Sequence, residues 1–125
     1  MTIDEKGLEA IEKSAKTTLG SYQKLSRRTA FPIDMKGDFI YYVFGLTGEV
    51  GELINKIKKI FRDDNGTVTQ EKRDYIEQEL GDVLWYLAQI ATEFDLSLED
   101  IAQANLEKLQ SRQKRGKISG SGDYR

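Results

Sequence analysis

The sequence predicts an all-α fold, an antiparallel helical bundle of four to five helices, and two observations favour it. The chain of 125 residues contains a single proline, Pro32, and few runs of β-branched residues, so little in it favours strands. Long stretches instead carry apolar residues at alternating intervals of three and four, which places them on one face of a helix. A chain of this length forms one domain, in which we expect an N-terminal helical segment (1–37), a central set of helices (38–116) and a flexible tail (117–125).

The N-terminal segment combines a polar helix with a shorter helical piece. One apolar face predicts a helix over residues 4–19, formed by Leu8, Ile11, Ala15 and Leu19. The second piece continues through Tyr22, Leu25 and Ala30 until Pro32 breaks it. Residues 34–37 are then expected to form a loop.

The strongest periodicity of the chain predicts a helix from Phe39 to about Arg62. Its apolar residues follow one seam, formed by Val43, Leu46, Val50, Leu53, Ile57 and Ile60. At a rise of 1.5 Å per residue, this helix is about 35 Å long. The polar run from Asp63 to Gly66 ends it.

Two more helices follow, each opened by a residue that favours an N-cap. Thr69 is the expected N-cap of a helix that runs to about Phe94. The inward face of that helix comprises Ile76, Leu80, Val83, Leu87, Ile90 and Phe94. Ser97 and Asp100 have the spacing of a capping box and open the last helix, which ends near Gly116. The tail contains Gly-Ser-Gly and is expected to be a flexible end or a clasp.

The composition excludes several kinds of chemistry. Because the chain lacks cysteine, disulfides, thiolate zinc sites and cysteine nucleophiles are excluded. Because it also lacks histidine, Ser-His-Asp catalysis, His-ligated metals and the Glu-x-x-His motif of di-iron carboxylate sites are excluded. A net charge of −2 argues against a protein that coats nucleic acid. With no apolar signal segment after Met1 and no apolar run of about 18 residues, we expect a cytoplasmic protein with neither membrane nor nucleic acid as partner.

Two acidic pairs share a form that the other acidic pairs lack. Each reads Glu-apolar-Gly-acid inside a long apolar helix, as Glu49-Val-Gly-Glu52 and Glu79-Leu-Gly-Asp82. At about 100° per residue, Glu49 and Glu79 lie about 60–70° from the centres of their seams, and Glu52 and Asp82 about 120–130°. Two such helices packed antiparallel could therefore bring both pairs to one edge of a shared seam.

Four converging carboxylates would repel one another, and each pair flanks a glycine that costs about 1 kcal/mol inside a helix. A hard divalent cation with oxygen ligands would account for the acids, with Mg²⁺ preferred and Mn²⁺ as the alternative. The glycines would then leave space for a bulky ligand or a close helix. The competing interpretation is a solvated helix face, which we keep for the remaining pairs, Glu9/Glu12, Glu71/Asp74 and Asp74/Glu77.

Two aromatic residues lie next to the second acidic pair in the sequence. Tyr86 shares the helix stripe of Glu79 and Asp82, where it could stack on a planar base or belong to the rim of the core. Trp85 points nearly opposite the apolar seam. This position predicts either an oligomer contact or part of a second core face.

Polar and basic residues suited to a polyphosphate lie on two helices. Asn105, Lys108 and Arg112 fall within about 60° of one another on the last helix, where arginine offers forked hydrogen bonds and lysine a point charge. The alternative for Lys108 and Arg112 is a basic last turn favoured by the helix dipole. Lys56 and Lys59 lie on the stripe of the first acidic pair.

These motifs occur in an order that resembles a known family. Glu49-x-x-Glu52, 26 residues, Glu79-x-x-Asp82 and then Asn105-Leu-Glu-Lys108-Leu-x-x-Arg112 are similar to the MazG-like all-α nucleoside triphosphate pyrophosphohydrolases. The similarity spans roughly residues 39–125, and the closing residues 115–125 resemble a single-domain branch of the family.

The resemblance implies a Mg²⁺-dependent enzyme whose catalytic helices are those of residues 38–116. It would cleave an NTP or dNTP between the α- and β-phosphates and release a nucleoside monophosphate and pyrophosphate. Glu49, Glu52, Glu79 and Asp82 would bind the metal, and one carboxylate, which we expect to be Glu52, would orient or deprotonate the attacking water. Tyr86, Asn105, Lys108 and Arg112 match substrate-binding positions, and Lys59 stands where some relatives carry an aromatic base contact.

Two other function classes stay open. The chain could be a catalytically idle helical regulator that binds a nucleotide or a protein, or a structural bundle with acids on its surface. Whichever function holds, the apolar seams of the two long central helices are too long for short flanking helices to cover. The side chains of Phe44, Phe61 and Trp85 add aromatic surface. We therefore expect a homodimer or a homotetramer.

Overall fold

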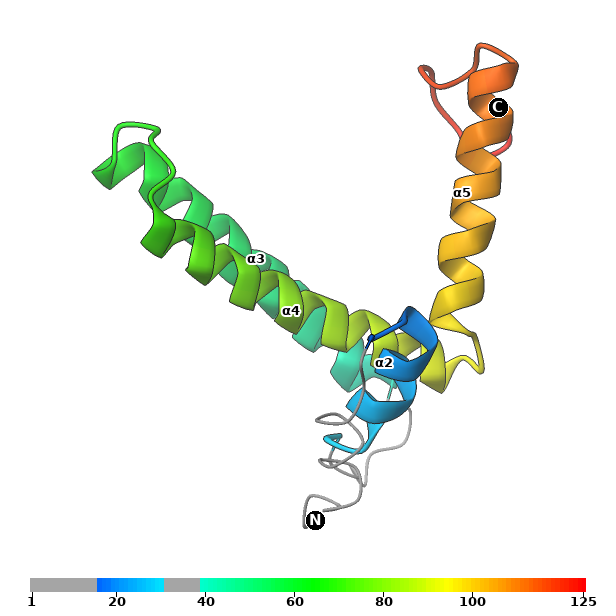
Figure 1. Ribbon diagram of the computed structural model, residues 1–125, viewed down its shortest axis with the longest axis horizontal. Helices are drawn as coiled ribbons and strands as arrows, with labels where there is room; N and C mark the ends of the chain where they lie inside the picture. The colour runs from blue at the N-terminus through cyan, green and yellow to red at the C-terminus, as the bar shows by residue number, and fades with distance from the viewer. Residues whose placement is uncertain (1–15, 31–38) are drawn as a thin grey trace.

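The computed structural model describes residues 16–30 and 39–125. Within these ranges it contains four helices and no strands: α2 (Leu19–Arg27), α3 (Phe39–Asp63), α4 (Gln70–Glu93) and α5 (Leu98–Lys114). Helices α3 and α4 form a long antiparallel hairpin, α2 packs across one end of it, and α5 runs away from that same end (Figure 1). The predicted all-α class is confirmed.

The helix boundaries follow from caps that are visible in the sequence. The Thr69 side chain accepts a hydrogen bond from the Lys72 amide at 3.2 Å and opens α4, and the Ser97 hydroxyl accepts one from the Asp100 amide at 3.2 Å and opens α5. Between α3 and α4 the chain reverses through Asn65 and Gly66, both with positive φ (52° and 80°). The three predicted central helices therefore match α3, α4 and α5.

The N-terminal prediction is largely outside the described residues, including most of the helix predicted over residues 4–19 and the loop expected at residues 34–37. Its described end differs from the prediction, because residues 16–18 are not helical. Thr18 has extended backbone geometry, and its hydroxyl accepts a hydrogen bond from the Ser21 amide at 3.1 Å. A new helix therefore begins at Leu19, where the first predicted helix was expected to end.

Each long helix buries only half of its predicted apolar seam. In α3 one set of residues spaced by seven is buried or half-buried and the other is exposed: Leu46, Leu53 and Ile60 against Val43, Val50 and Ile57. In α4 the same division separates Ile76, Val83 and Ile90 from Leu80, Leu87 and Phe94. A contact between two helices covers a narrow stripe, so the residues at the second heptad position of each helix are only partly covered by the described residues and stay 38–55% exposed.

The most buried part of the structure lies where α2 crosses α4. Ala88 and Ala91 are buried there, and their small side chains allow the two helices to approach closely. Gln89 is fully buried and donates a hydrogen bond to the Ser26 hydroxyl at 3.0 Å. The indole N–H of Trp85 donates to the Thr29 hydroxyl at 2.8 Å, so Trp85 lies on a second core face of α4, one of the two alternatives that the sequence left open.

The side chain of Gln23 joins α2 to the corner between α4 and α5. Its amide nitrogen donates to the Leu96 carbonyl at 2.8 Å and to the Thr92 hydroxyl at 3.1 Å. Its amide oxygen accepts from the Leu98 amide at 2.7 Å, which is one of the N–H groups that the first turn of α5 leaves without a helical partner. One side chain therefore fixes three elements.

Among the described residues, no helix combines the length and the apolar character that a membrane span requires.

We predict that Gln23→Leu lowers the free energy of unfolding by about 2 kcal/mol, because it leaves the Leu96 carbonyl and the Leu98 amide without their partner. The matched control is Gln103→Leu, which removes an exposed bond to Glu107 within α5 and should change stability by less than about 0.5 kcal/mol. Urea unfolding measures both. Equal effects would contradict the clamping role of Gln23.

Candidate functional site

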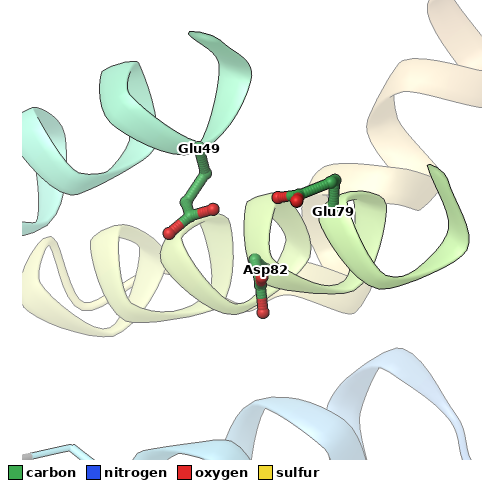
Figure 2. Close-up of side chains that lie close together, drawn as sticks. All are labelled: Glu49, Glu79 and Asp82. Carbon is green, nitrogen blue, oxygen red and sulfur yellow. The ribbon is translucent and has the colours of Figure 1, made fainter. Parts of the chain in front are cut away.

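Three carboxylates from the two long helices meet at one place in the hairpin. Glu49 comes from α3, and Glu79 and Asp82 come from successive turns of α4 (Figure 2). One carboxylate oxygen of each residue lies within 4.8 Å of the other two. The antiparallel pairing of α3 and α4 therefore brings together three of the four acids that the sequence singled out.

The fourth acid, Glu52, is exposed and stands outside this group of three. It remains close enough for its negative charge to act on Glu49 one turn away. The structure thus separates a tight group of acids from a free carboxylate at its edge, a distinction that spacing in the sequence does not provide.

The three acids are held together against their own repulsion. The pKa of Glu49 is raised first by burial, then by the negative charges of Asp82, Glu79 and Glu52, and finally by a hydrogen bond with Glu79. A bound cation would remove this penalty, because it favours the charged form of every carboxylate around it.

The sequence left two explanations for the glycines between the paired acids, space for a bulky ligand or a close helix, and no helix of the described chain lies close to them. A Cβ atom at Gly51 or Gly81 would meet nothing within 4 Å, so the space beside both residues is open. The close approach occurs at Gly45, where a Cβ atom would collide with the ring of Tyr86. Gly45 thus makes room for the Tyr86 ring to lie against α3.

A pocket of about 320 Å³ opens beside the acids. Its lining combines two of the carboxylates with aromatic and hydroxyl side chains: Thr29, Glu49, Asp82, Trp85 and Tyr86. The rings of Trp85 and Tyr86 meet edge to face with 5.0 Å between their centroids. Burial raises the pKa of the Tyr86 phenol, and the neighbouring Tyr41, Glu49 and Asp82 raise it further. Tyr86 is therefore fixed at the acids, as its position in the sequence indicated.

Side chains from α2 and from Thr29, just after it, line the pockets beside the acids, and the sequence did not predict this. Thr29 and Trp85 also line a second, apolar pocket of about 250 Å³, together with Thr17, Tyr22, Leu25 and Ser26. The pKa of Tyr22 is raised by burial and then by the charge of Asp82, which places this phenol near the acids. More than 50 residues separate Thr29 from Trp85 along the chain, so no local pattern could have indicated the contact.

The lysines predicted to accompany the acids lie further along the hairpin. Lys56 and Lys59 follow Glu49 by seven and ten residues, which is about 10 and 15 Å along the helix axis. The ammonium group of Lys56 lies 4.9 Å from the centre of the Tyr75 ring. The positive charge of Lys59 helps to lower the pKa of Asp63 at the end of α3. The structure does not bring either lysine into the group of acids.

The predicted phosphate-binding residues of α5 are also separated from the acids within one chain. Asn105, Lys108 and Arg112 lie on the helix that leaves the hairpin (Figure 1). Asn105 and Lys108 are exposed, whereas Arg112 is only 5% exposed because the C-terminal residues cover it. Within the described chain, the structure therefore does not bring these three residues to the group of acids.

Comparisons with known proteins identify relatives of this chain. Residues 40–116 match the family described as the MazG nucleotide pyrophosphohydrolase domain. The gene 37 protein of Mycobacterium phage L5 is 56% identical over 85 residues, which cover 68% of this chain and 75% of the phage protein. The uncharacterized protein YpjD of Bacillus subtilis (strain 168) is 32% identical over 69 residues, or 55% of this chain and 61% of that protein. No solved structure gives a significant match.

We predict that Glu49→Gln stabilises the metal-free protein increasingly as the pH rises. Because the folded pKa of Glu49 is raised above its ordinary value of 4.5, the folded state holds this proton more tightly than the unfolded state. Stability is therefore lost as the pH rises from the ordinary pKa through the raised one, and the neutral amide side chain of the variant escapes this loss. The measurement is the melting temperature in a chelator between pH 4 and pH 8.

The control for this comparison is Glu77→Gln, an exposed acid of α4 outside the group of three. The difference in melting temperature between Glu49→Gln and the parent should grow with pH and then level off. For Glu77→Gln it should stay flat. A Glu49→Gln protein that is less stable than the parent at pH 7 would contradict the repulsion argument.

Proposed function

The chain belongs to the MazG nucleotide pyrophosphohydrolase domain family, and on this premise we propose that it hydrolyses a nucleoside triphosphate between the α- and β-phosphates. The substrate is an NTP or dNTP, and the products are a nucleoside monophosphate and pyrophosphate. The observation that carries the proposal is the convergence of Glu49, Glu79 and Asp82 at a pocket that also contains the Tyr86 ring. Carboxylates for a metal and an aromatic face for a base are thereby adjacent.

The donor set fits a hard divalent cation. All three groups offer oxygen, which Mg²⁺ and Mn²⁺ prefer to nitrogen or sulfur. One oxygen of each carboxylate lies within 4.8 Å of the other two, so rotations that bring these side chains closer would let Glu49, Glu79 and Asp82 hold one such cation. When bound, the cation would neutralise the triphosphate and polarise the phosphoryl oxygens.

The remaining groups of the pocket have separable roles. Glu52 is not among the three converging carboxylates, so it is free to accept a proton from the attacking water and to orient that water toward the phosphorus. Tyr86 presents a ring that is immobilised by Gly45 and Trp85 and can stack on the base of the nucleotide. At the pocket wall, the Thr29 hydroxyl donates to the Ser26 carbonyl at 2.6 Å and accepts from the Trp85 indole at 2.8 Å, which holds Trp85 in place beside Tyr86.

We further propose that a second copy of the chain completes the site. The uncovered heptad stripes of α3 and α4 continue into other exposed apolar side chains, among them Phe44 and Phe61, each 71% exposed. Contiguous exposed apolar side chains are a feature of surfaces that bind a partner, and these stripes with Phe44 and Phe61 are candidates for such a surface. In a dimer or tetramer that buries these stripes, α5 of one copy would bring Asn105, Lys108 and Arg112 to the triphosphate held by the hairpin of the other.

The second candidate function is an idle regulator that binds a nucleotide without hydrolysing it. The observation that favours it is the burial of Arg112 under the C-terminal residues. The pocket at Tyr86 stays open to a nucleotide, while this guanidinium is withheld from the phosphates at which hydrolysis would occur. Tight nucleotide binding without turnover would support this function over hydrolysis.

We predict that the parent protein releases pyrophosphate from at least one nucleotide in a panel of NTPs, dNTPs and modified nucleotides with Mg²⁺. Glu79→Gln and Asp82→Asn should each lower turnover by about 100-fold or more, since a metal-bound phosphoryl oxygen is worth several kcal/mol in the transition state. Glu52→Gln should also lower turnover but should keep most of the rise in melting temperature caused by Mg²⁺. Glu77→Gln is the control and should change neither property. No pyrophosphate from any nucleotide would refute the hydrolase proposal.

We predict that two inactive variants restore activity when they are mixed. Glu79→Gln damages the hairpin and Lys108→Ala damages α5, so a mixed dimer contains one site in which both parts are intact. Equal mixing should recover about one quarter of the parental activity. The control mixes Glu79→Gln with Asp82→Asn, which both damage the hairpin and should recover nothing. Failure to complement, or a scattering mass near 14.3 kDa at micromolar concentration, would contradict the shared site.

A further inference from the structure

The last nine residues, 117–125, form a closed loop on the end of α5, which we call the tail loop. The Lys117 amide donates to the Arg112 carbonyl at 2.7 Å and turns the chain back at the helix end. The Arg125 guanidinium then donates to the carbonyls of Lys117 and Ile118, each at 3.2 Å, and to that of Gly122. Figure 1 shows this segment folded beside the C-terminal part of α5. A single arginine therefore closes the loop.

The closed tail loop lies on the cations that suit a polyphosphate. Nη2 of Arg112 donates to the Asp123 carbonyl at 2.6 Å and to the Gly122 carbonyl at 3.4 Å. The Asp123 carboxylate lies 3.8 Å from Nη2 of Arg112 and 3.9 Å from Nζ of Lys108. Arg115 holds the end of the loop through a bond of 2.9 Å to the Arg125 carbonyl oxygen. Oxygens of the chain itself thus occupy the place that phosphate oxygens would take.

The tail loop leaves one hydrogen-bond donor of the Arg112 guanidinium without a partner. The Nε atom of Arg112 is buried and has no hydrogen-bond partner, although both tail-loop carbonyls bond Nη2. Nε and a terminal nitrogen of a guanidinium form a fork that matches two oxygens of one phosphate. The Asp123 carboxylate does not replace such a ligand, because it is 83% exposed and no closer than 3.8 Å. A phosphate would therefore satisfy a donor that the tail loop leaves unpaired.

We propose that the tail loop is a displaceable cover, which a polyphosphate removes by taking the place of Asp123 on Lys108 and Arg112. The proposal rests on the proposed phosphate-binding role of these two residues and adds a competition within the same chain. Glycines with positive φ, Gly116 at 65° directly before the loop and Gly120 at 111° and Gly122 at 89° within it, provide positions at which the backbone can open. Closing the loop lowers polyphosphate affinity, and opening it exposes Arg112.

The test uses the full-length chain and inorganic tripolyphosphate, without divalent metal and without turnover. Arg125→Gln removes the three bonds that close the tail loop and also removes one positive charge. Electrostatics alone would weaken anion binding to this variant, whereas displacement of a cover predicts binding about two- to fivefold tighter by calorimetry. The matched control is Arg73→Gln on α4, which loses the same charge at an exposed site and should bind no more tightly than the parent. Unchanged or weaker binding to Arg125→Gln would overturn the proposal.

Trypsin cleavage of the parent after Lys117 gives a second readout that needs no variant. The Lys117 carbonyl is held by Arg125 in the closed tail loop, so cleavage should be slow and should accelerate when tripolyphosphate is added. Sodium chloride at matched ionic strength is the control. No acceleration beyond that control would overturn the cover. If tripolyphosphate accelerates cleavage but the protein hydrolyses no nucleotide, the tail loop is a displaceable cover and the hydrolase proposal is wrong. If the protein hydrolyses a nucleotide but cleavage does not respond to tripolyphosphate, the hydrolase proposal stands and the proposed cover is wrong.

Discussion

The convergence of the carboxylates of Glu49, Glu79 and Asp82 on the α3–α4 hairpin is the constraint on which the proposed site depends. Burial and then the charges of Asp82, Glu79 and Glu52 raise the pKa of Glu49, and a bound cation would oppose this effect. The antiparallel hairpin holds the three carboxylates in place through the buried half of its apolar seam, which continues on both sides of the acids. Packing energy along two long helices thus maintains a local arrangement that is unfavourable in isolation, which is what a preformed cation site requires.

The same hairpin is the basis of the proposal that a second copy completes the site. An antiparallel pair of helices buries one heptad position of each helix and leaves the second position partly exposed. Helix α5 does not cover this second position, because α5 leaves the hairpin at the corner that the Gln23 side chain holds (Figure 1). This geometry exposes apolar stripes and also carries the basic residues of α5 away from the acids. Both features are resolved together if a second copy packs on the stripes and presents its own α5. Assembly and catalysis would then depend on the same surface.

The end of α5 shows a buried positive charge that the chain itself compensates only in part. Arg112 is buried beneath carbonyls of the tail loop, and Lys108 faces the exposed Asp123 carboxylate. Neutral carbonyl oxygens and a distant carboxylate compensate a buried guanidinium less well than a phosphate does, because they leave Nε unpaired. Nη2 of Arg112 is therefore hydrogen-bonded, whereas its Nε is not. A ligand that offers two oxygens to one guanidinium edge has the stronger interaction.

The sequence by itself determined the helices from Phe39 onward, the two acidic pairs that are candidates for a metal site, and the family. Thr69, Ser97 and the run from Asp63 to Gly66 specify helix ends through contacts within four residues, so local pattern is sufficient there. Two echoed motifs sufficed to place Glu49, Glu79 and Asp82 on facing helices, because a helix has a fixed angular period.

Only the tertiary structure decided which side chains meet. It left Glu52 outside the group of three acids and placed Lys56 against Tyr75 rather than beside the acids. It also joined Thr29 to Trp85 and laid the tail loop over Arg112. These outcomes depend on how α2 crosses α4 and how the chain turns after α5. Such contacts are set by packing between distant segments, and no periodicity within one segment encodes them.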